Sequence, residues 1–261
     1  MFAWWRQRQR EKILQQPFPA AWRLVIDRNV GHAAFLDAEE RKLLEDMSQV
    51  FLEEKQLEGC GGLELTDEIR VTVAANACLL LLGLDHDMYR RVKSVLIYPS
   101  TVRQPERKGG VFHVHAYEPT RSSPLLGEAH KRGPVILVWD AARHGSWNAH
   151  DGHNVIFHEF AHKLDMLDGD VDGTPPLRGS AQLRRWAKVC SRIYLELRAR
   201  TERGRKTFLD AYGATNEAEF FAVATETFFE QPKQLRKRHP ELYALLQDFY
   251  RQDPAQRVHR P

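Results

Sequence analysis

Cysteines and long apolar runs are scarce in this sequence, and each shortage argues against a class of protein. Cys60, Cys78 and Cys190 form an odd count without CxxC spacing, which suits a reducing compartment rather than a disulfide scaffold. The longest apolar run, residues 77–82, is far too short to span a bilayer. Residues 1–10 contain no continuous apolar segment, so we expect no secretory signal. Together these shortages predict a cytoplasmic protein.

The sequence also has little excess of one sign of charge over the other. The formal net charge of the 261 residues is only +3, so the composition does not indicate direct nucleic-acid binding. A chain of this length with 43% hydrophobic residues can bury a large core, as ordinary soluble globular proteins do. Trp4 and Trp5 stand beside arginines, and here we favour a helix docked on its own protein over contact with a membrane. We therefore expect neither a nucleic-acid nor a membrane partner.

Hydrophobic spacing predicts an α+β fold that is mostly helical. The predicted helices cover residues 4–15, a short piece around Trp22, a segment beginning at Ala38, and residues 68–82, 154–165, 181–200, 216–230 and 240–252. The predicted strands cover residues 92–98, 111–117 and 135–139. We expect the strands to form a small mixed sheet next to the helix at residues 154–165.

A polar, charged stretch at residues 103–110 predicts a boundary between two lobes. Residues 1–107 are predicted to form a mainly helical N-terminal lobe. Residues 108–252 are predicted to form the catalytic lobe, and residues 253–261 a flexible tail.

The central motif is His158-Glu159-Phe160-Ala161-His162. On a helix, residues four apart lie on the same face, so His158 and His162 can offer imidazole nitrogens to one metal ion. A Zn²⁺ ion held by two histidines and a third protein ligand keeps a position for water and lowers the pKa of that water to roughly 7. Glu159 is placed to take a proton from the water and pass it to a leaving amine. The motif therefore predicts a zinc peptidase.

A bare HExxH motif also arises by composition alone, so its surroundings matter. An apolar, strand-like run at residues 135–139 and a polar, turn-rich link at residues 140–148 precede the motif. The motif helix has apolar residues available for burial, among them Phe157, Phe160 and Leu164. This order of strand, link and helix favours the metal site over a chance match.

Three residues are candidates for the third metal ligand. Asp168 lies six residues past His162, but that arrangement needs a glycine where this sequence has Asp165. Asp165 is better placed to accept a hydrogen bond from an imidazole, although a solvated acid at a helix end is an equal alternative. Glu219, from a separate helix, can complete a His₂Glu site, and we favour it over a purely capping role behind Asn216.

A second histidine pair, His113 and His115, alternates along the predicted strand at residues 111–117. The pair can serve as metal ligands or as the polar face of an edge strand. We favour the polar face, because no carboxylate or cysteine ligand stands near the pair in the sequence.

The stretches HEFAHKLD and YGATNEAEFFA resemble the family of Mlc titration factor A, a glucose-regulated bacterial peptidase, and the related catalytic domain of anthrax lethal factor. Further similar stretches extend the resemblance over roughly residues 20–250. The resemblance implies a zincin-like metallopeptidase fold. It also implies that His158, His162 and Glu219 bind one Zn²⁺ ion, that Glu159 is the general base, and that the Tyr212 hydroxyl faces the developing oxyanion. For Tyr212 the alternative is a core aromatic residue.

Two positions, Val223 and His130, depart from the pattern of these relatives. Val223 stands where the lethal-factor domain has a second acid, one turn after its glutamate ligand. Glu226 can take a supporting part at the metal site or be a solvated helix acid. His130 stands where the family suggests an aromatic residue, which affects the substrate pocket more than the metal.

The leading hypothesis is a cytoplasmic zinc metallopeptidase that hydrolyses peptide bonds, and the resemblance suggests aminopeptidase-like action. An edge strand at residues 111–117 or 135–139 can hold the peptide extended. The alternative is a regulatory protein that sequesters a transcriptional repressor of the Mlc type, linked to sugar uptake, with peptidase activity secondary. The basic cluster at residues 236–239 can serve that contact, although a solvated helix end is the simpler interpretation.

Overall fold

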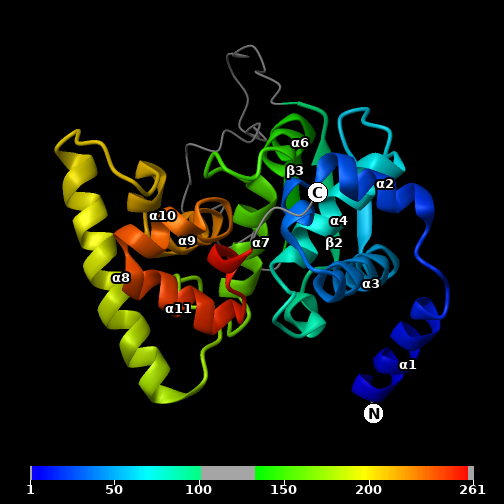
Figure 1. The fold of residues 1–261 in the computed structure, drawn as a ribbon, viewed down its shortest axis with the longest axis horizontal. Helices are drawn as coiled ribbons and strands as arrows, with labels where there is room; N and C mark the ends of the chain where they lie inside the picture. Colours follow the sequence, from blue (N-terminus) through cyan, green and yellow to red (C-terminus); the bar gives the residue numbers. More distant parts are fainter. Residues whose placement is uncertain (1, 101–132, 258–261) are drawn as a thin grey trace, which may run out of the picture.

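Helices make up most of residues 2–100 and 133–257, the parts of the chain that the structure, a computed structural model, describes (Figure 1). The helices are α1 (Phe2–Leu14), α2 (Ala20–Asn29), α3 (Ala38–Glu54), α4 (Asp67–Leu79), α6 (Trp139–Trp147), α7 (Val155–Asp165), α8 (Gly179–Glu202), α9 (Glu217–Glu230), α10 (Pro232–Arg238) and α11 (Pro240–Tyr250). The strands are β1 (Gln56–Gly59), β2 (Ser94–Tyr98) and β3 (Val135–Val138). The predicted strand with His113 and His115, the predicted lobe boundary and His130 lie outside the described residues.

Polar capping residues begin the helices close to where the sequence predicts. Asp37 accepts a hydrogen bond from Glu40 N at 2.8 Å, and the Glu40 carboxylate accepts one from Asp37 N at 3.2 Å. Thr66 caps α4 through Ile69 N. Such caps satisfy N–H groups that have no partner inside the helix. The predicted helices in the described segments are confirmed, with ends that differ by a few residues.

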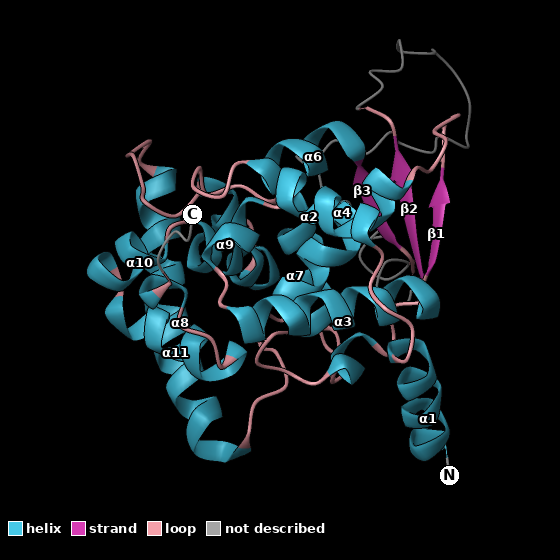
Figure 2. Ribbon diagram, turned by 45° about the vertical axis from the view of Figure 1, so that its right-hand side comes forward, coloured by secondary structure: helices cyan, strands magenta, loops and turns pink. Residues whose placement is uncertain are grey.

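The three described strands form one sheet in the order β1-β2-β3 (Figure 2). Both pairs are parallel, with Val95 opposite Val135 and Ile97 opposite Leu137. The sequence predicts a mixed sheet, whereas the described strands all run in one direction. From β1 to β2 the direction is kept by a crossover through α4, as parallel strands require.

Three elements differ from the sequence-based prediction. β1 was not predicted, because only Leu57 of its four residues is buried and no apolar alternation marks it. α10 was not predicted either. Residues 140–148 are predicted as a polar link but form most of α6. Gly145 allows that helix to approach the start of α7, since an added Cβ would lie 2.8 Å from His153 O.

A hydrophobic core joins the helices to one face of the sheet, where Leu57, Val95, Ile97, Val135 and Leu137 are buried. Its buried residues run from Ile26 in α2 through Phe51 in α3 and Phe160 in α7 to Tyr250 in α11. The motif helix α7 lies in the middle of the molecule, in contact with α4, α6, α9 and β3 (Figure 1). Its position inside the core fixes the direction in which its histidines point.

Helix α1 packs beside α3 through its arginines and not through its tryptophans. Arg10 forms ion pairs with Glu54 and Asp87, at 2.6 and 2.8 Å. Trp4 and Trp5 stay 61% and 58% exposed, so the predicted docking of this helix does not bury them. Among the described helices, none combines the length and the hydropathy needed to cross a membrane.

Candidate metal centre

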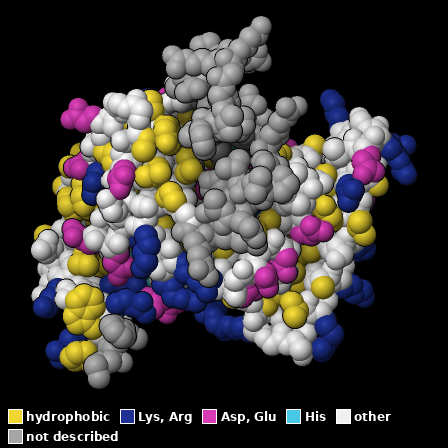
Figure 3. Space-filling view, turned by 180° about the vertical axis from the view of Figure 1, so that it is seen from behind, with side chains coloured by type: hydrophobic (Ala, Val, Ile, Leu, Met, Phe, Trp, Pro, Cys, Tyr) yellow, Lys and Arg dark blue, Asp and Glu magenta, His cyan; other side chains and the backbone are white. Residues whose placement is uncertain are grey.

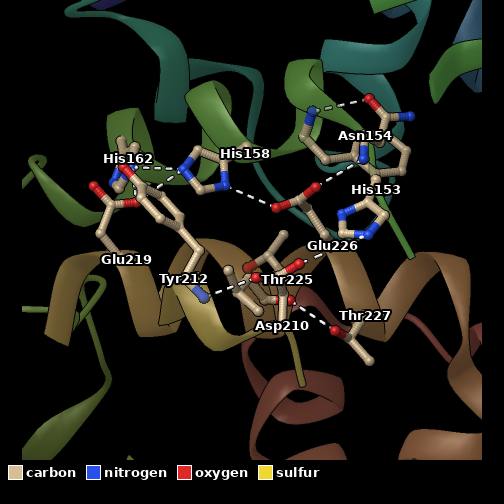
Figure 4. A network of polar contacts seen from close by, with 12 residues as sticks. His153, Asn154, His158, His162, Asp210, Tyr212, Glu219, Thr225, Glu226 and Thr227 are labelled. Atoms are coloured by element: carbon tan, nitrogen blue, oxygen red, sulfur yellow. Dashed lines mark hydrogen bonds and ion pairs between the residues drawn. The ribbon is translucent and has the colours of Figure 1, made fainter. Parts of the chain in front are cut away.

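Helix α7 places two histidines on one face. Asn154 caps the helix, because its side-chain oxygen accepts hydrogen bonds from Ile156 N and Phe157 N. Phe157 and Phe160 face the core with no exposed surface. His158 and His162 therefore point together away from the core, and their Nε2 atoms lie 3.2 Å apart (Figure 4).

Helix α9 brings Glu219 to the same place. Asn216 accepts a hydrogen bond from Glu219 N at 2.9 Å, so the predicted cap is present. The Glu219 carboxylate is directed elsewhere: its Oε2 lies 2.9 Å from His158 Nε2 and 3.4 Å from His162 Nε2. Capping through the backbone and contact with the histidines are therefore compatible at this residue.

The chemistry of these three side chains fits a divalent cation such as Zn²⁺. One ligand atom from each of His158, His162 and Glu219 can be chosen so that all three lie within 4.8 Å of one another. Two imidazoles and a carboxylate are a common donor set for zinc with an open position. Burial disfavours charge here, yet hydrogen bonds with the histidines lower the pKa of Glu219, while Glu219 and Glu226 raise that of His158. The carboxylates of Glu219 and Glu226 therefore favour a positive charge at the imidazoles.

Glu226 holds His158 from behind. Its Oε1 lies 2.7 Å from His158 Nδ1, and its Oε2 accepts a hydrogen bond from Asn154 N at 2.7 Å (Figure 4). Glu226 is buried, so the solvated-acid alternative is wrong. A carboxylate on Nδ1 fixes the ring and leaves Nε2 to face Glu219 and His162.

A buried polar network continues from Asn154 into the molecule. The Asn154 side-chain amide donates to Asn76 Oδ1 at 3.2 Å and to Glu230 Oε1 at 3.5 Å. Glu230 Oε1 in turn lies 2.8 Å from His32 Nε2. Burial raises the pKa of Glu230 to about 9 and lowers that of His32 to about 3, so the pair is a neutral hydrogen bond near pH 7. The cap of the motif helix is therefore tied to α4 and α9 and to the His32 segment.

Asp165 lies beneath the second histidine, one turn on. It has no exposed surface, so the solvated helix-end alternative is wrong. Its Oδ2 accepts a hydrogen bond from Gly173 N at 3.1 Å. Gly173 has a φ of +75°, and an added Cβ would lie 2.2 Å from Glu217 O, so only glycine fits there. Asp165 therefore secures the loop that passes the start of α9.

Asp165 and His162 form no hydrogen bond with each other in the described part of the chain, although the charge of His162 acts on the Asp165 carboxyl. The charge of His162 is one of the influences that lower the pKa of Asp165, while burial outweighs them and raises it to about 6. His162 Nδ1 and Asp165 Oδ1 are both buried and have no hydrogen-bond partner in the described part of the chain. The orienting role predicted for Asp165 stays a prediction.

Tyr212 and Glu159 lie beside the three candidate ligands. Asp210 positions the turn that carries Tyr212, because its carboxylate accepts a hydrogen bond from Tyr212 N at 2.7 Å. The Tyr212 ring lies 5.9 Å from the His158 ring, centroid to centroid (Figure 4). Burial and the nearby carboxylates of Glu219 and Glu159 raise the pKa of the Tyr212 hydroxyl. That hydroxyl therefore remains a hydrogen-bond donor at neutral and moderately alkaline pH.

Asp168, the competing third ligand, is exposed and accepts a hydrogen bond from Asp170 N in a turn after α7. In the described segments, His158, His162 and Glu219 form the one group suited to a metal ion. Val223, one turn after Glu219, is buried against Gly213. Asn154, Asn76 and Glu230 were not predicted for the site. The place of Asn154 directly before the motif helix is a signal for its capping role, whereas Asn76 and Glu230 carry no such local signal.

A His₂Glu cluster on two packed helices, with a glutamate next to the first histidine, is the arrangement of a metallopeptidase centre. The family described as glucose-regulated metallo-peptidase M90 matches residues 2–251, and this chain belongs to that family.

Known relatives agree with the assignment to this family. Mlc titration factor A of Salmonella arizonae is 36% identical over 228 residues, which are 85% of this chain and 88% of that protein. Mlc titration factor A of Klebsiella pneumoniae is 31% identical over 264 residues, 99% of this chain and 94% of that protein. An uncharacterized protein of Synechocystis is 39% identical over 252 residues, 96% of this chain and 89% of that protein. The resemblance to the family of Mlc titration factor A, inferred from the two motifs, is therefore confirmed.

Proposed function

We propose that this protein is a zinc-dependent peptidase with a zincin-like catalytic lobe, in which His158, His162 and Glu219 hold one Zn²⁺ ion. The observation that carries the proposal is the convergence of the three side chains, within 4.8 Å, from two helices whose sequences lie more than 50 residues apart. Membership of a metallopeptidase family supports it.

The side chains around the candidate ligands supply proton transfer and hydrogen bonding. When bound, the ion would supply Lewis-acid polarisation of the substrate carbonyl and of the attacking water. Glu159 accepts the proton of the attacking water and passes it to the leaving amine. The Tyr212 hydroxyl, kept protonated by its raised pKa, donates a hydrogen bond to the oxygen that becomes negative. Glu226 keeps the His158 ring in place throughout.

We place the substrate along β3. This strand contacts α7 and continues directly into α6, so a peptide paired with it would lie next to the motif helix. Main-chain hydrogen bonds to a strand edge hold a peptide extended with little demand on its side chains. Short peptides cut in an aminopeptidase-like way, in the cytoplasm, are the substrates we propose.

Replacing the general base tests this assignment. Glu159→Gln keeps the shape of the side chain and removes its basicity, so peptide cleavage should fall by roughly 10²–10⁴-fold. The zinc content should stay at that of the wild type, because Glu159 is not among the three ligands. Glu217→Gln, at an exposed position on α9, is the matched control and should leave both quantities unchanged. Undiminished cleavage by Glu159→Gln would contradict the proposal.

A second candidate function is capture of a transcriptional repressor of the Mlc type. The name of the relatives, Mlc titration factor A, favours it. The two functions are separable by one variant: Glu159→Gln should bind a purified Mlc-type repressor as the wild type does while failing to cleave peptides. Loss of both properties together would argue against a separate binding role.

A further inference from the structure

A cavity of about 320 Å³ lies between the C-terminal half of α8, the loop after α8 and the end of α10. This volume is at the lower end of the range of small-molecule sites, roughly 300–1,000 Å³. Buried apolar side chains form its floor: Ile193, Leu197 and Leu209. In the view from behind, Lys and Arg side chains gather at the corner where α8 ends (Figure 3).

Three cations converge on this cavity from three segments. Arg200 comes from the last turn of α8, Lys206 from the loop, and Arg238 from the end of α10. Glu196 is the one acid among the lining residues, and its Oε1 forms an ion pair with Arg200 Nη1 at 3.9 Å. Within residues 2–100 and 133–257, Lys206 and Arg238 have no carboxylate partner. The cavity therefore carries excess positive charge.

The preference of helix C-termini for cations explains part of this positive charge. It does not explain why cations from three segments meet at one cavity. A cation in the last turn of a helix interacts favourably with the helix dipole, which accounts for Arg200 and Arg238 taken singly. It does not account for Lys206, which lies in a loop. His239 also lines the cavity, and burial together with the surrounding arginines lowers its pKa, so the ring is neutral at pH 7 and can hydrogen-bond a ligand.

We propose that this cavity binds a small soluble phosphate monoester, with the phosphate held by Arg200, Lys206 and Arg238 and the organic part on the apolar floor. Guanidinium groups match the oxygens of a phosphate in pairs, and such charge-assisted hydrogen bonds are strong. The site is separate from the candidate metal ligands, so the proposal does not depend on the peptidase assignment.

The cavity wall is continuous with the segment that carries Tyr212. The Phe208 ring is covered by Arg238 at 4.9 Å and stacks on His239 at 6.1 Å. Leu209 follows, and Asp210 then binds Tyr212 N. A ligand that fixes Arg238 and Lys206 should therefore reduce the local opening of residues 206–214, which amide hydrogen exchange reports.

Calorimetric titration with phenyl phosphate tests the site. The cavity variant is Arg200→Gln with Arg238→Gln. The matched control is Arg184→Gln with Lys233→Gln, which removes the same charge from exposed positions of the same helices outside the cavity. The wild type should bind one molecule saturably, the cavity variant at least about tenfold more weakly and the control within about twofold of the wild type. Phenol and inorganic phosphate should each bind more weakly than phenyl phosphate.

Two further measurements keep the proposal falsifiable. Lys206→Gln, a change in the loop alone, should weaken binding on its own, and phenyl phosphate should slow hydrogen exchange in residues 206–214 of the wild type. Absence of saturable binding at millimolar concentrations, or equal weakening in the control, would overturn the proposal. Binding to phosphatidic acid vesicles without binding of phenyl phosphate would also overturn it, in favour of a lipid headgroup.

Discussion

Charged side chains cross several helix interfaces in the described part of the chain, and two of these interfaces differ clearly in burial. Between α7 and α9, His158 contacts Glu219 and Glu226, and the side chains are 13%, 12% and 8% exposed. Between α8 and α11, Arg185 pairs with Asp248 at 3.1 Å, and these side chains are 51% and 55% exposed. The buried contacts hold the side chains in one geometry, whereas the exposed pair is solvated in both the folded and the unfolded protein. Similar charge pairs thus build a site in one place and contribute little in the other.

Breaking the buried interface should give the largest effect. Glu226→Ala leaves His158 Nδ1 and Asn154 N without their acceptor, so the free energy of unfolding should fall by about 3–5 kcal/mol. Zinc affinity should fall by roughly 10–100-fold, because the His158 ring is no longer oriented. Urea unfolding and competition with a zinc chelator measure the two quantities.

Glu226→Gln provides the control for that experiment. Its amide oxygen can still accept one of the two hydrogen bonds, so part of the stability and of the zinc affinity should return. Wild-type zinc affinity in Glu226→Ala would show that His158 needs no support from α9.

The buried Glu230 predicts a pH dependence that the exposed pairs lack. Its pKa is raised from 4.5 to about 9, so the folded state binds a proton that the unfolded state has lost, and stability falls as the pH rises toward 9. His32, with its pKa lowered to about 3, acts in the opposite direction but only below its ordinary pKa of 6.5. Between pH 7 and 9, therefore, the change in stability that Glu230 causes is not mixed with an effect of His32.

Glu230→Gln should flatten the fall in unfolding free energy between pH 7 and 9, by up to about 1.4 kcal/mol per pH unit. Urea unfolding at pH 7, 8 and 9 measures it. Glu217→Gln, at an exposed position on the same helix, should leave the slope of the wild type unchanged. Equal slopes in Glu230→Gln and the wild type would mean that Glu230 is ionised in the folded protein.

The smallest effect is expected at the exposed interface. Arg185→Ala should change the unfolding free energy by less than about 1 kcal/mol, because an exposed ion pair contributes about 0–1 kcal/mol. Addition of salt should reduce the difference further. A loss as large as that of Glu226→Ala would remove the contrast between the two interfaces.

Local signals in the sequence predicted the parts of the site that depend on one helix at a time. The spacing of His158 and His162 fixes their common face, and Asn216 marks the start of α9. The preference for Glu219 over Asp168 as a neighbour of the histidines also agrees with the structure, because short turns after α7 leave Asp168 in solvent.

Packing between helices could not be predicted in the same way. Glu226 and Asp165 read equally well as solvated acids, because burial of a helix position depends on what packs against it. Nothing local indicated that Asn154 would meet Asn76 and Glu230, whose helices lie far away in the sequence. β1 and α6 lacked a clear period for a similar reason: neighbouring elements, and not their own composition, determine which of their residues are buried.

X-ray absorption at the zinc edge tests the central claim most directly. The purified protein should contain about one zinc per chain, coordinated by two imidazole nitrogens and by oxygen at about 2.0–2.2 Å. Glu219→Ala should lose most of this zinc, whereas Glu217→Ala should keep it. A sulfur shell around the metal, or full zinc occupancy with an unchanged spectrum in Glu219→Ala, would contradict the assignment of His158, His162 and Glu219 as the metal ligands.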